Sequence, residues 1–390
     1  MRRVRLKEIG TFYSGLSGKS KSDFSEGNAL LVTYRNIFNN PVLNPAIKDT
    51  VVVGKDEKQN EVLWGDILIT GSSETPADAG MSSVVLFNPQ EKMYLNSFCF
   101  GFRLNDMNEA LPSYIGHLLR STSIRAAISK TAFGVTRFNV NRMRFADIEI
   151  PLPPLNIQKE IVSILDSFTS LIDKMKQEVE MRKKQMEYYR EKLMAPQKNW
   201  EIKTLGEIGT FTRGNGLQKS DFRVKGFPCV HYGQIHTYYN TCIYKTKSFC
   251  EEDLAKKLQK ASYGDLLIAT TSEDVKACCK AAVWFGAGDV AYSGDSFCYS
   301  HDQDPKYMAY LFQTEMFAKQ KQKAATGAKV IRVSGESMVS FSFAFPPLVQ
   351  QRQIASILDT FETYISKLEK MIELRQKQYE YYREKLLTFE

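Results

Sequence analysis

Residues 158–193 read QKEIVSILDSFTSLIDKMKQEVEMRKKQMEYYREKL, and residues 351–386 read QRQIASILDTFETYISKLEKMIELRQKQYEYYREKL. The two segments are identical at 20 of 36 positions, at an offset of 193 residues. Weaker echoes lie upstream at an offset of 199 residues: EIGTF at 8–12 and 207–211, GDILI at 65–69 with GDLLI at 264–268, and SFC at 97–99 and 296–298. Self-similarity over so long a period indicates a duplicated fold whose intervening loops have diverged.

The repeated segment is predicted to be a long amphipathic helix, because apolar side chains recur at spacings of three and four residues. The residues expected to form the helix-to-helix or partner interface are Ile161, Leu165, Phe168, Ile172, Met175, Val179, Tyr189, Leu193, Ile354, Leu358, Phe361, Ile365, Leu368, Ile372, Tyr382 and Leu386. Proline pairs at 153–154 and 346–347 precede the helices, and Pro196 ends the first one, because proline cannot lie inside a helix. From Asn156 to Ala195 the first helix would span roughly 55 to 60 Å at ~1.5 Å per residue.

Each apolar stripe needs a partner, and the other copy of the helix supplies one. Because the chain must return along the second helix, the pair is predicted to pack antiparallel. The expected organisation is a globular domain at 1–152, a long helix at 153–196, a second globular domain at 197–345 and a second long helix at 346–390. The predicted fold class is therefore α+β, with two pseudo-two-fold-related α/β domains separated by a pair of long antiparallel coiled-coil helices.

The composition is typical of a multi-domain globular protein. The 390 residues are 43% hydrophobic, and 52 Lys and Arg against 44 Asp and Glu leave a net charge of +8. Such an excess permits binding to a polyanion without requiring it. The seven cysteines lack regular spacing, so we expect reduced, mostly buried thiols. No run approaches 18 apolar residues, so we expect no membrane partner and a cytoplasmic location.

The globular regions are predicted to mix strands and helices. Short apolar or alternating runs at 30–32, 67–69, 83–87 and 98–102 are typical of strands between turns. Helical spacing appears at 114–129 and 307–323, and each patch leads into a glycine loop, at 132–134 and 325–327. The duplication thus covers strands, helices and loops alike.

The order of these elements resembles the specificity subunits of type I restriction-modification enzymes over nearly the whole chain. The most specific element is the PPL-to-helix junction, PLPPLNIQ at 151–158 and FPPLVQQ at 345–351, each time behind a GD-hydrophobic strand. The resemblance implies two target-recognition domains, each reading half of a bipartite, asymmetric site in double-stranded DNA. It also implies that the helix pair fixes the unread spacer and docks two methyltransferase subunits, which restriction subunits then join. No cofactor is expected in this chain, whereas S-adenosylmethionine, ATP and magnesium are expected in the partner subunits.

Base reading needs side chains that present paired donors and acceptors, and the echoing loops are rich in these. The DNA-binding candidates are Tyr34, Arg35, Asn36, Ser72, Ser73, Glu74, Thr136, Arg137 and Asn139 in the first domain, and Tyr232, Gln234, His236, Thr271, Ser272, Glu273, Lys329 and Arg332 in the second. Each has a structural alternative. The Ser-Glu pairs also suit a turn or helix cap, the tyrosines also suit a sheet, and the basic residues also suit a solvated surface.

No catalytic or metal site is predicted. The chain lacks a Gly-Lys-Ser/Thr phosphate loop, a glycine-rich methyltransferase signature and an Asn/Asp-Pro-Pro-aromatic motif. Glu273, Asp274 and Lys276 superficially resemble a nuclease cluster, but the first copy has Glu74 and Asp78 without a nearby lysine. Two alternatives stay open: a specificity subunit of another restriction or methylation system, and a coiled-coil scaffold that does not bind DNA.

Overall fold

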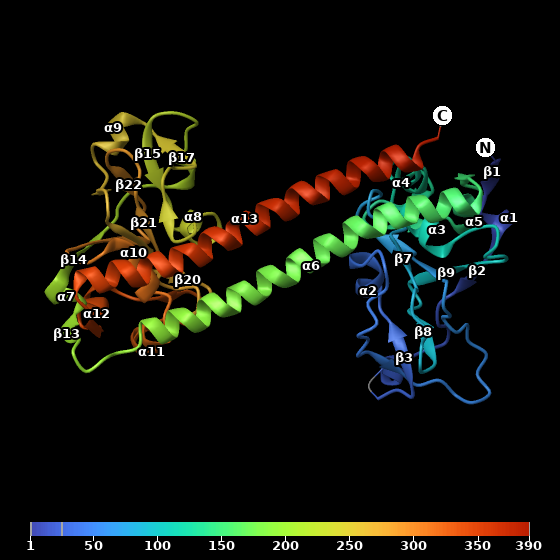
Figure 1. Cartoon of the computed structure of the whole chain (residues 1–390), viewed down its shortest axis with the longest axis horizontal. Helices are drawn as coiled ribbons and strands as arrows, with labels where there is room; N and C mark the ends of the chain where they lie inside the picture. Colours follow the sequence, from blue (N-terminus) through green and yellow to red (C-terminus); the bar gives the residue numbers. More distant parts are fainter. Residues whose placement is uncertain (1, 25, 390) are drawn as a thin grey trace. The chain divides into compact units, whose positions relative to one another are not determined.

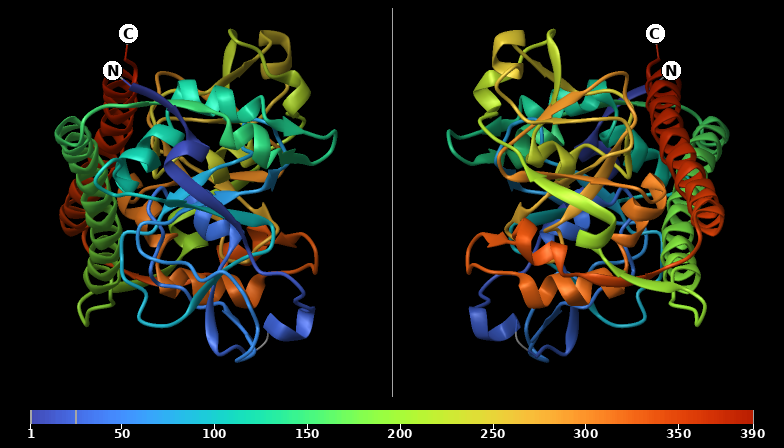
Figure 2. Two further views of the ribbon diagram at one scale, coloured as in Figure 1. Left: turned by 90° about the vertical axis from the view of Figure 1, so that its right-hand side faces the viewer. Right: turned by 90° about the vertical axis from the view of Figure 1, so that its left-hand side faces the viewer.

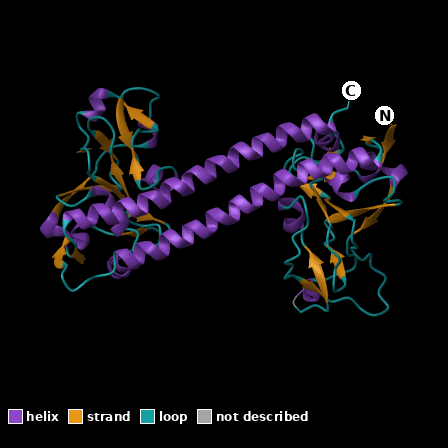
Figure 3. Cartoon of the chain, in the orientation of Figure 1, coloured by secondary structure: helices purple, strands orange, loops and turns teal. Residues whose placement is uncertain are grey.

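The computed structural model describes residues 2–24 and 26–389, and its mixture of strands with two long helices confirms the predicted fold class (Figure 3). The chain divides into two compact units: unit 1 comprises Met1–Lys176 and Lys370–Glu390, and unit 2 comprises Gln177–Glu369. Each unit therefore combines one globular domain with the start of one long helix and the end of the other.

The long helices are α6, Leu155–Leu193, and α13, Leu348–Leu387, drawn in green and in orange to red in Figure 1. Helix α6 begins one residue before the predicted start and ends two residues before the predicted end, so the helical prediction is confirmed closely. Both helices begin directly after a proline pair, which ends the preceding strand.

The two helices run antiparallel. In unit 2, Lys183 Nζ of α6 lies 2.9 Å from Glu369 Oε1 of α13, and the Tyr189 and Phe361 rings stack at 5.5 Å. A residue further along α6 therefore contacts a residue earlier in α13, as expected for antiparallel helices. In unit 1 the equivalent stack joins Phe168 to Tyr382, with ring centroids 5.4 Å apart. The start of α6 (green) and the end of α13 (red), which both belong to unit 1, lie next to each other in the left view of Figure 2.

Most of the side chains expected between the helices are shielded from solvent. The buried ones are Ile161, Leu165, Ile172, Met175, Val179, Ile354, Leu358, Ile365 and Leu368, and the half-buried ones are Phe168, Leu193, Phe361, Ile372 and Leu386. Tyr189 and Tyr382 are 37% and 39% exposed. At the helix ends, the neighbouring Met194 and Leu387 fill the core instead. Each tyrosine stacks its ring on a phenylalanine of the other helix.

The first domain is built on small sheets. Its largest sheet is fully antiparallel, in the order β2 (Gly10–Ser14), β9 (Cys99–Leu104), β5 (Ile67–Thr70) and β7 (Ser82–Val84). A second sheet has the order β4 (Thr50–Val51), β3 (Ala29–Val32) and β8 (Met93–Leu95), and a third has the order β10 (Ala132–Phe133), β11 (Phe138–Val140) and β6 (Ser72–Ser73). Strand β1 (Arg2–Arg5) pairs with β12 (Glu149–Leu152). The helices are α1 (Leu6–Ile9), α2 (Tyr34–Asn39), α3 (Pro112–Leu119), α4 (Thr122–Ser129) and α5 (Arg142–Ala146), with a 3-10 turn at Lys21–Phe24.

The second domain repeats this plan with additions. Its largest sheet has the order β14 (Gly209–Arg213), β23 (Ser296–His301), β19 (Leu266–Ala269), β21 (Lys280–Trp284) and β16 (Cys242–Ile243). A four-stranded sheet has the order β17 (Ser248–Cys250), β15 (Phe227–Val230), β22 (Val290–Tyr292) and β18 (Lys260–Ala261). Two pairs complete it: β13 (Glu201–Thr204) with β25 (Ser342–Phe345), and β20 (Thr271–Ser272) with β24 (Ile331–Arg332). The helices are α7 (Leu205–Ile208), α8 (Tyr232–Thr237), α9 (Glu252–Ala255), α10 (Pro305–Leu311), α11 (Glu315–Ala324) and α12 (Gly335–Val339), with a 3-10 turn at Lys219–Asp221.

Each helical patch predicted in the domains is two helices, not one. The Ser121 hydroxyl donates to the Leu118 carbonyl at 2.7 Å, and Thr314 donates to Leu311 in the same way at 2.7 Å. These bonds occupy carbonyls that a continuous helix would use, so α3 ends before α4 and α10 ends before α11. A carboxylate from a long helix then accepts the first free N–H of the following helix. Glu384 binds Thr122 N at 2.9 Å, and Glu191 binds Glu315 N at 3.1 Å.

A buried glutamine joins each domain to the start of its helix. Gln158 Oε1 accepts from Leu111 N at 2.9 Å, and its Nε2 donates to the carbonyls of Glu109 and Pro153 at 2.9 and 2.8 Å. In unit 2, Gln351 accepts from Asp304 N at 3.0 Å and donates to the Pro346 carbonyl at 2.8 Å. Both side chains are at most 1% exposed. The glutamine of the PPL-to-helix motif thus holds the domain and the helix together.

We expect Gln158→Ala to lower the free energy of unfolding by about 2–4 kcal/mol, because it leaves one buried N–H and two carbonyls without partners. Denaturant unfolding measures this change. Gln177→Ala, at an exposed position of the same helix, is the control and should cost nothing. Equal stability of the two variants would contradict the assigned role of Gln158.

Candidate nucleic-acid interface

A short hairpin beside a two-residue strand forms the same small structure in both domains. In the first domain, Phe138 and Asn139 of β11 pair with Ser73 and Ser72 of β6. In the second, Ile331 and Arg332 of β24 pair with Ser272 and Thr271 of β20. In each domain the glycine loop (132–134 or 325–327) therefore lies beside the Ser-Glu loop (72–80 or 271–279).

The two hairpins turn in the same way. Gly134 and Gly327 both have positive φ, 138° and 99°. A Cβ at Gly134 would lie 2.0 Å from the Arg137 carbonyl oxygen, and one at Gly327 would lie 2.1 Å from that of Val330. The matching register makes three pairs of positions equivalent: Thr136 with Lys329, Arg137 with Val330, and Asn139 with Arg332. One backbone thus presents different side chains in the two domains.

The hairpin of the first domain forms one wall of a cleft of about 590 Å³. The predicted residues that line it are Tyr34, Ser72, Ser73, Glu74, Thr136 and Arg137, together with Phe38, Thr75, Asp78, Asn96 and Phe98. The other candidates, Arg35, Asn36 and Asn139, lie outside this lining, and Arg35 and Asn139 are exposed. The cleft therefore gathers most of the candidates of the first domain.

Arg137 is held by contacts on both sides of its guanidinium group. Its Nε donates to Ser72 Oγ at 3.0 Å, and its Cζ lies 5.3 Å from the centre of the Phe98 ring. Ser72 is 4% exposed, whereas Phe98 is 59% exposed. A buried hydroxyl and an open aromatic face thus fix the plane of the guanidinium.

Asn36 braces its own loop. Its Oδ1 accepts from Asn44 N at 3.1 Å and from Asn40 Nδ2 at 3.0 Å, and its Nδ2 donates to the Asn44 carbonyl at 3.0 Å. The polar atoms of this side chain are engaged within the domain. Its position in the structure favours a role in shaping the loop after α2.

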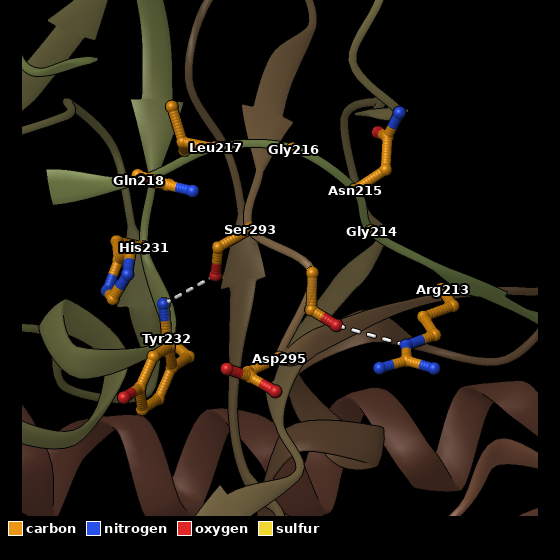
Figure 4. Close-up of a pocket in the computed structure, with 11 residues that line it drawn as sticks. Arg213, Gly214, Asn215, Gly216, Leu217, Gln218, His231, Tyr232, Ser293 and Asp295 are labelled. Atoms are coloured by element: carbon orange, nitrogen blue, oxygen red, sulfur yellow. Dashed lines mark hydrogen bonds between the residues drawn. The ribbon is translucent and has the colours of Figure 1, made fainter. Parts of the chain in front are cut away.

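A cleft of about 490 Å³ lies in the second domain, between the loop at 214–218 and the turn at 293–295 (Figure 4). Tyr232 N donates to Ser293 Oγ at 2.9 Å, and Arg213 Nε donates to the Gly294 carbonyl at 3.1 Å. Burial, followed by the charge of Lys219, lowers the pKa of His231 in its wall. Of the predicted candidates, Tyr232 lines this cleft.

Arg213, His231 and Asp295 are cleft residues that sequence reasoning did not select as candidates. The repeat offers a signal for Asp295, because the offset of 199 aligns it with Asn96, which lines the cleft of the first domain. The other two occupy positions where the copies differ in sequence. The equivalent of Arg213 at the offset of 199 is Ser14, and the equivalent of His231 is Thr33, at the offset of 198 that also aligns Tyr232 with Tyr34.

Three other candidates of the second domain bond within the domain. Gln234 Nε2 donates to Ser248 Oγ at 2.7 Å, and His236 Nε2 lies 2.9 Å from the Thr271 carbonyl. Thr271 Oγ1 donates to Asp295 Oδ1 at 3.4 Å. By contrast, Glu273, Lys329 and Arg332 are exposed, and Ser272 is half-buried. The exposed residues sit on the hairpin and the loop next to it.

The Ser-Glu loop is fixed in each domain by a cation that binds its carbonyl oxygens. In the first domain, Arg125 donates to the carbonyls of Ala79 and Gly80 at 2.6 and 2.7 Å. In the second, Lys321 Nζ donates to the carbonyls of Lys276 and Cys278, both at 2.8 Å. Burial lowers the pKa of both cations, and the hydrogen bonds provide compensating acceptors. Both domains thus hold this loop rigidly by similar means.

The acidic residues near Lys276 form a turn. Asp274 N donates to Ser272 Oγ at 3.3 Å, and Lys276 N donates to Asp274 Oδ1 at 3.0 Å. Within residues 2–24 and 26–389, no group of three or more His, Cys, Asp or Glu side chains is placed to hold a metal ion. Over the same residues, no helix is long and apolar enough to cross a membrane.

The family model for the type I restriction modification DNA specificity domain matches residues 1–181 and again residues 197–376. The chain belongs to this specificity family. The two matches coincide with the two copies of the fold, so the chain carries two DNA specificity domains.

Known proteins agree with this membership. A putative type I restriction enzyme specificity subunit of Haemophilus influenzae is 30% identical over 272 residues, covering 66% of this chain and 68% of the relative. The EcoR124I/EcoR124II specificity subunit of Escherichia coli is 28% identical over 254 residues, covering 62% and 63%. The chain thus spans about two thirds of the length of each. The crystal structure of a type I system S subunit from M. genitalium shares the fold, with a TM-score of 0.56 at 14% identity over 100% of this chain and 96% of that one.

Because the hairpin tip positions Arg137, we expect Gly134→Ala to lower DNA affinity about tenfold or more, comparable to losing one good base contact. The added methyl group would collide with the Arg137 carbonyl oxygen. DNA titration of the assembled enzyme measures the change. Gly18→Ala is the matched control, since Gly18 also has positive φ but has open space around it. Equal affinities of the two variants would show that the hairpin does not contact DNA.

Proposed function

We propose that this chain is the sequence-reading subunit of a type I restriction-modification enzyme, and that each domain reads one half of a bipartite, asymmetric site in double-stranded DNA. The observation that carries the proposal is the hairpin pair. Two copies of one backbone hold Thr136, Arg137 and Asn139 in one domain and Lys329, Val330 and Arg332 in the other. Two domains that share one backbone geometry but carry different side chains are suited to reading two different half-sites.

The chemistry of these positions supports DNA as the ligand. Arginine, lysine, asparagine and threonine offer donors to base edges and to phosphates. The basic residues Lys329 and Arg332 are exposed, as contact with a phosphate backbone requires. The expectation that helix length sets the gap between the half-sites stays a prediction.

The long helices carry a duplicated apolar surface. Five pairs of equivalent large side chains, each 37–60% exposed, occur in α6 and α13: Ile164 with Ile357, Leu171 with Tyr364, Met181 with Leu374, Tyr188 with Tyr381, and Tyr189 with Tyr382. Unit 1 holds one full set of these positions and unit 2 holds the other. Two equal apolar surfaces suit two copies of one partner, which we infer to be the methyltransferase subunit.

We further propose that the chemical steps take place in the partner subunits. Methyl transfer from S-adenosylmethionine and ATP- and magnesium-dependent cleavage would belong to the methyltransferase and restriction subunits. The present chain would bind the recognition site and so determine where on the DNA the partner subunits act.

Co-expression with the methyltransferase subunit of the same system, followed by genome-wide mapping of methylated adenines, tests the proposal. We expect a bipartite motif with an unread gap. A single continuous motif would overturn the two-reader assignment. A motif of this kind whose enzyme is one fused polypeptide would favour the alternative of another restriction system.

A salt titration separates the proposal from a scaffold that does not bind DNA. Phosphate contacts release counterions, so affinity for duplex DNA should fall steeply as salt rises. Weak binding that does not change with salt would favour the scaffold.

We expect Tyr188→Asp to remove one of two bound methyltransferase subunits, because a charge cannot enter an apolar interface without cost. Tyr381→Asp should remove the other, and the double variant should bind neither. Native mass spectrometry of the complex reports the stoichiometry. Tyr263→Asp is the matched control, since Tyr263 is exposed in the second domain outside the long helices. Unchanged stoichiometry in the double variant would place the partner elsewhere.

A further inference from the structure

We propose that Arg137 is a specificity-determining residue that selects guanine at one position of the half-site read by the first domain, with Ser72 and Phe98 as its positioning residues. This inference rests on the proposed function and deepens it, because it names the base and the side chain that recognises it.

The guanidinium of Arg137 is arranged to donate two hydrogen bonds to one base. Its Nε already donates to Ser72 Oγ at 3.0 Å, so the remaining donors are the two terminal amino groups. Neither of these groups has a hydrogen-bond or ion-pair partner within the part of the chain that the structure describes. Two donors in one plane match the O6 and N7 acceptors that guanine presents in the major groove.

The surroundings of Arg137 restrict how it can meet DNA. The Phe98 ring lies against one face of the guanidinium, and the hydroxyl of Ser72 is buried in the sheet beneath it. An arginine held in this way loses less side-chain entropy on binding than a free one. The contact should therefore depend strongly on the position of the acceptor atoms.

The charges of the cleft favour a base edge over a phosphate. Glu74 and Asp78 line the same cleft as Arg137. Their carboxylates repel the phosphate backbone, whereas a base edge carries no net charge. The carboxylates can in addition accept from an exocyclic amino group such as that of cytosine. The lining thus suits base recognition.

The second domain lacks this contact. The hairpin position equivalent to Arg137 is Val330, which is 43% exposed and cannot donate a hydrogen bond. Thr271, the residue equivalent to Ser72, pairs across the strands with Arg332, and its hydroxyl donates to Asp295 Oδ1. The guanine contact of Arg137 therefore has no counterpart at the equivalent hairpin position of the second domain.

The test uses the complete enzyme with its methyltransferase subunits. Binding sites are selected from random-sequence duplex DNA, and the methylated motif is mapped in cells in parallel. We expect Arg137→Gln to reduce discrimination for guanine at one position by about tenfold or more while every other position keeps its preference. Arg137→Lys should lose much of the same discrimination, because it lacks two coplanar donors. Ser72→Ala should reduce the discrimination for guanine at the same position by a smaller factor. Arg3→Gln, which changes an exposed arginine of β1 outside the cleft, should leave the motif unchanged.

Two results would overturn the inference. One is a uniform loss of binding across all sequences in Arg137→Gln, which is the behaviour of a phosphate contact. The other is an unchanged motif in Arg137→Gln and Arg137→Lys. Failure of the proposed function would look different, because the unmodified enzyme would then select no bipartite motif. If Arg137→Gln fails to assemble, Arg137→Lys and Ser72→Ala decide between the outcomes.

Discussion

The side-chain amide of Gln158, with Gln351 in the second copy, fixes the attachment of each recognition domain to its long helix. Leu111, Pro153 and the first turn of α6 meet at this one buried group. An unpaired amide in the core is costly, so the domain cannot turn about the helix start without breaking these bonds. The position of each cleft relative to the helix that begins beside it depends on this contact.

Around this attachment the two copies preserve geometry and vary chemistry. Glu384 and Glu191 cap equivalent helices, and Gly134 and Gly327 turn equivalent hairpins. Even the support of the Ser-Glu loop is kept by different means, with Arg125 in one domain and Lys321 in the other. A common framework with different side chains at the hairpin tip is what a pair of independent DNA readers requires.

The fold was largely predictable because its evidence is local or repeated. The duplicated segment and its apolar spacing determine two long helices, and the proline pairs determine where they begin. The site was predictable only as a set of loops. Arg137 lies 65 residues from Ser72 in the chain, and no periodicity indicates that β11 pairs with β6. The bonds of Asn36, and the split between α3 and α4 at Ser121, likewise depend on hydrogen bonds that residue types alone leave open.

The discontinuity of unit 1 has a consequence for how the protein is made. Residues 177–369 of unit 2 are continuous, whereas unit 1 needs residues 370–390 to complete residues 1–176. At ~5–20 residues per second, the ribosome takes on the order of ten seconds or more to supply that segment. Until then, part of the apolar stripe of α6 in unit 1 waits for its partner from α13. The domain that is synthesised first is therefore the one that is completed last.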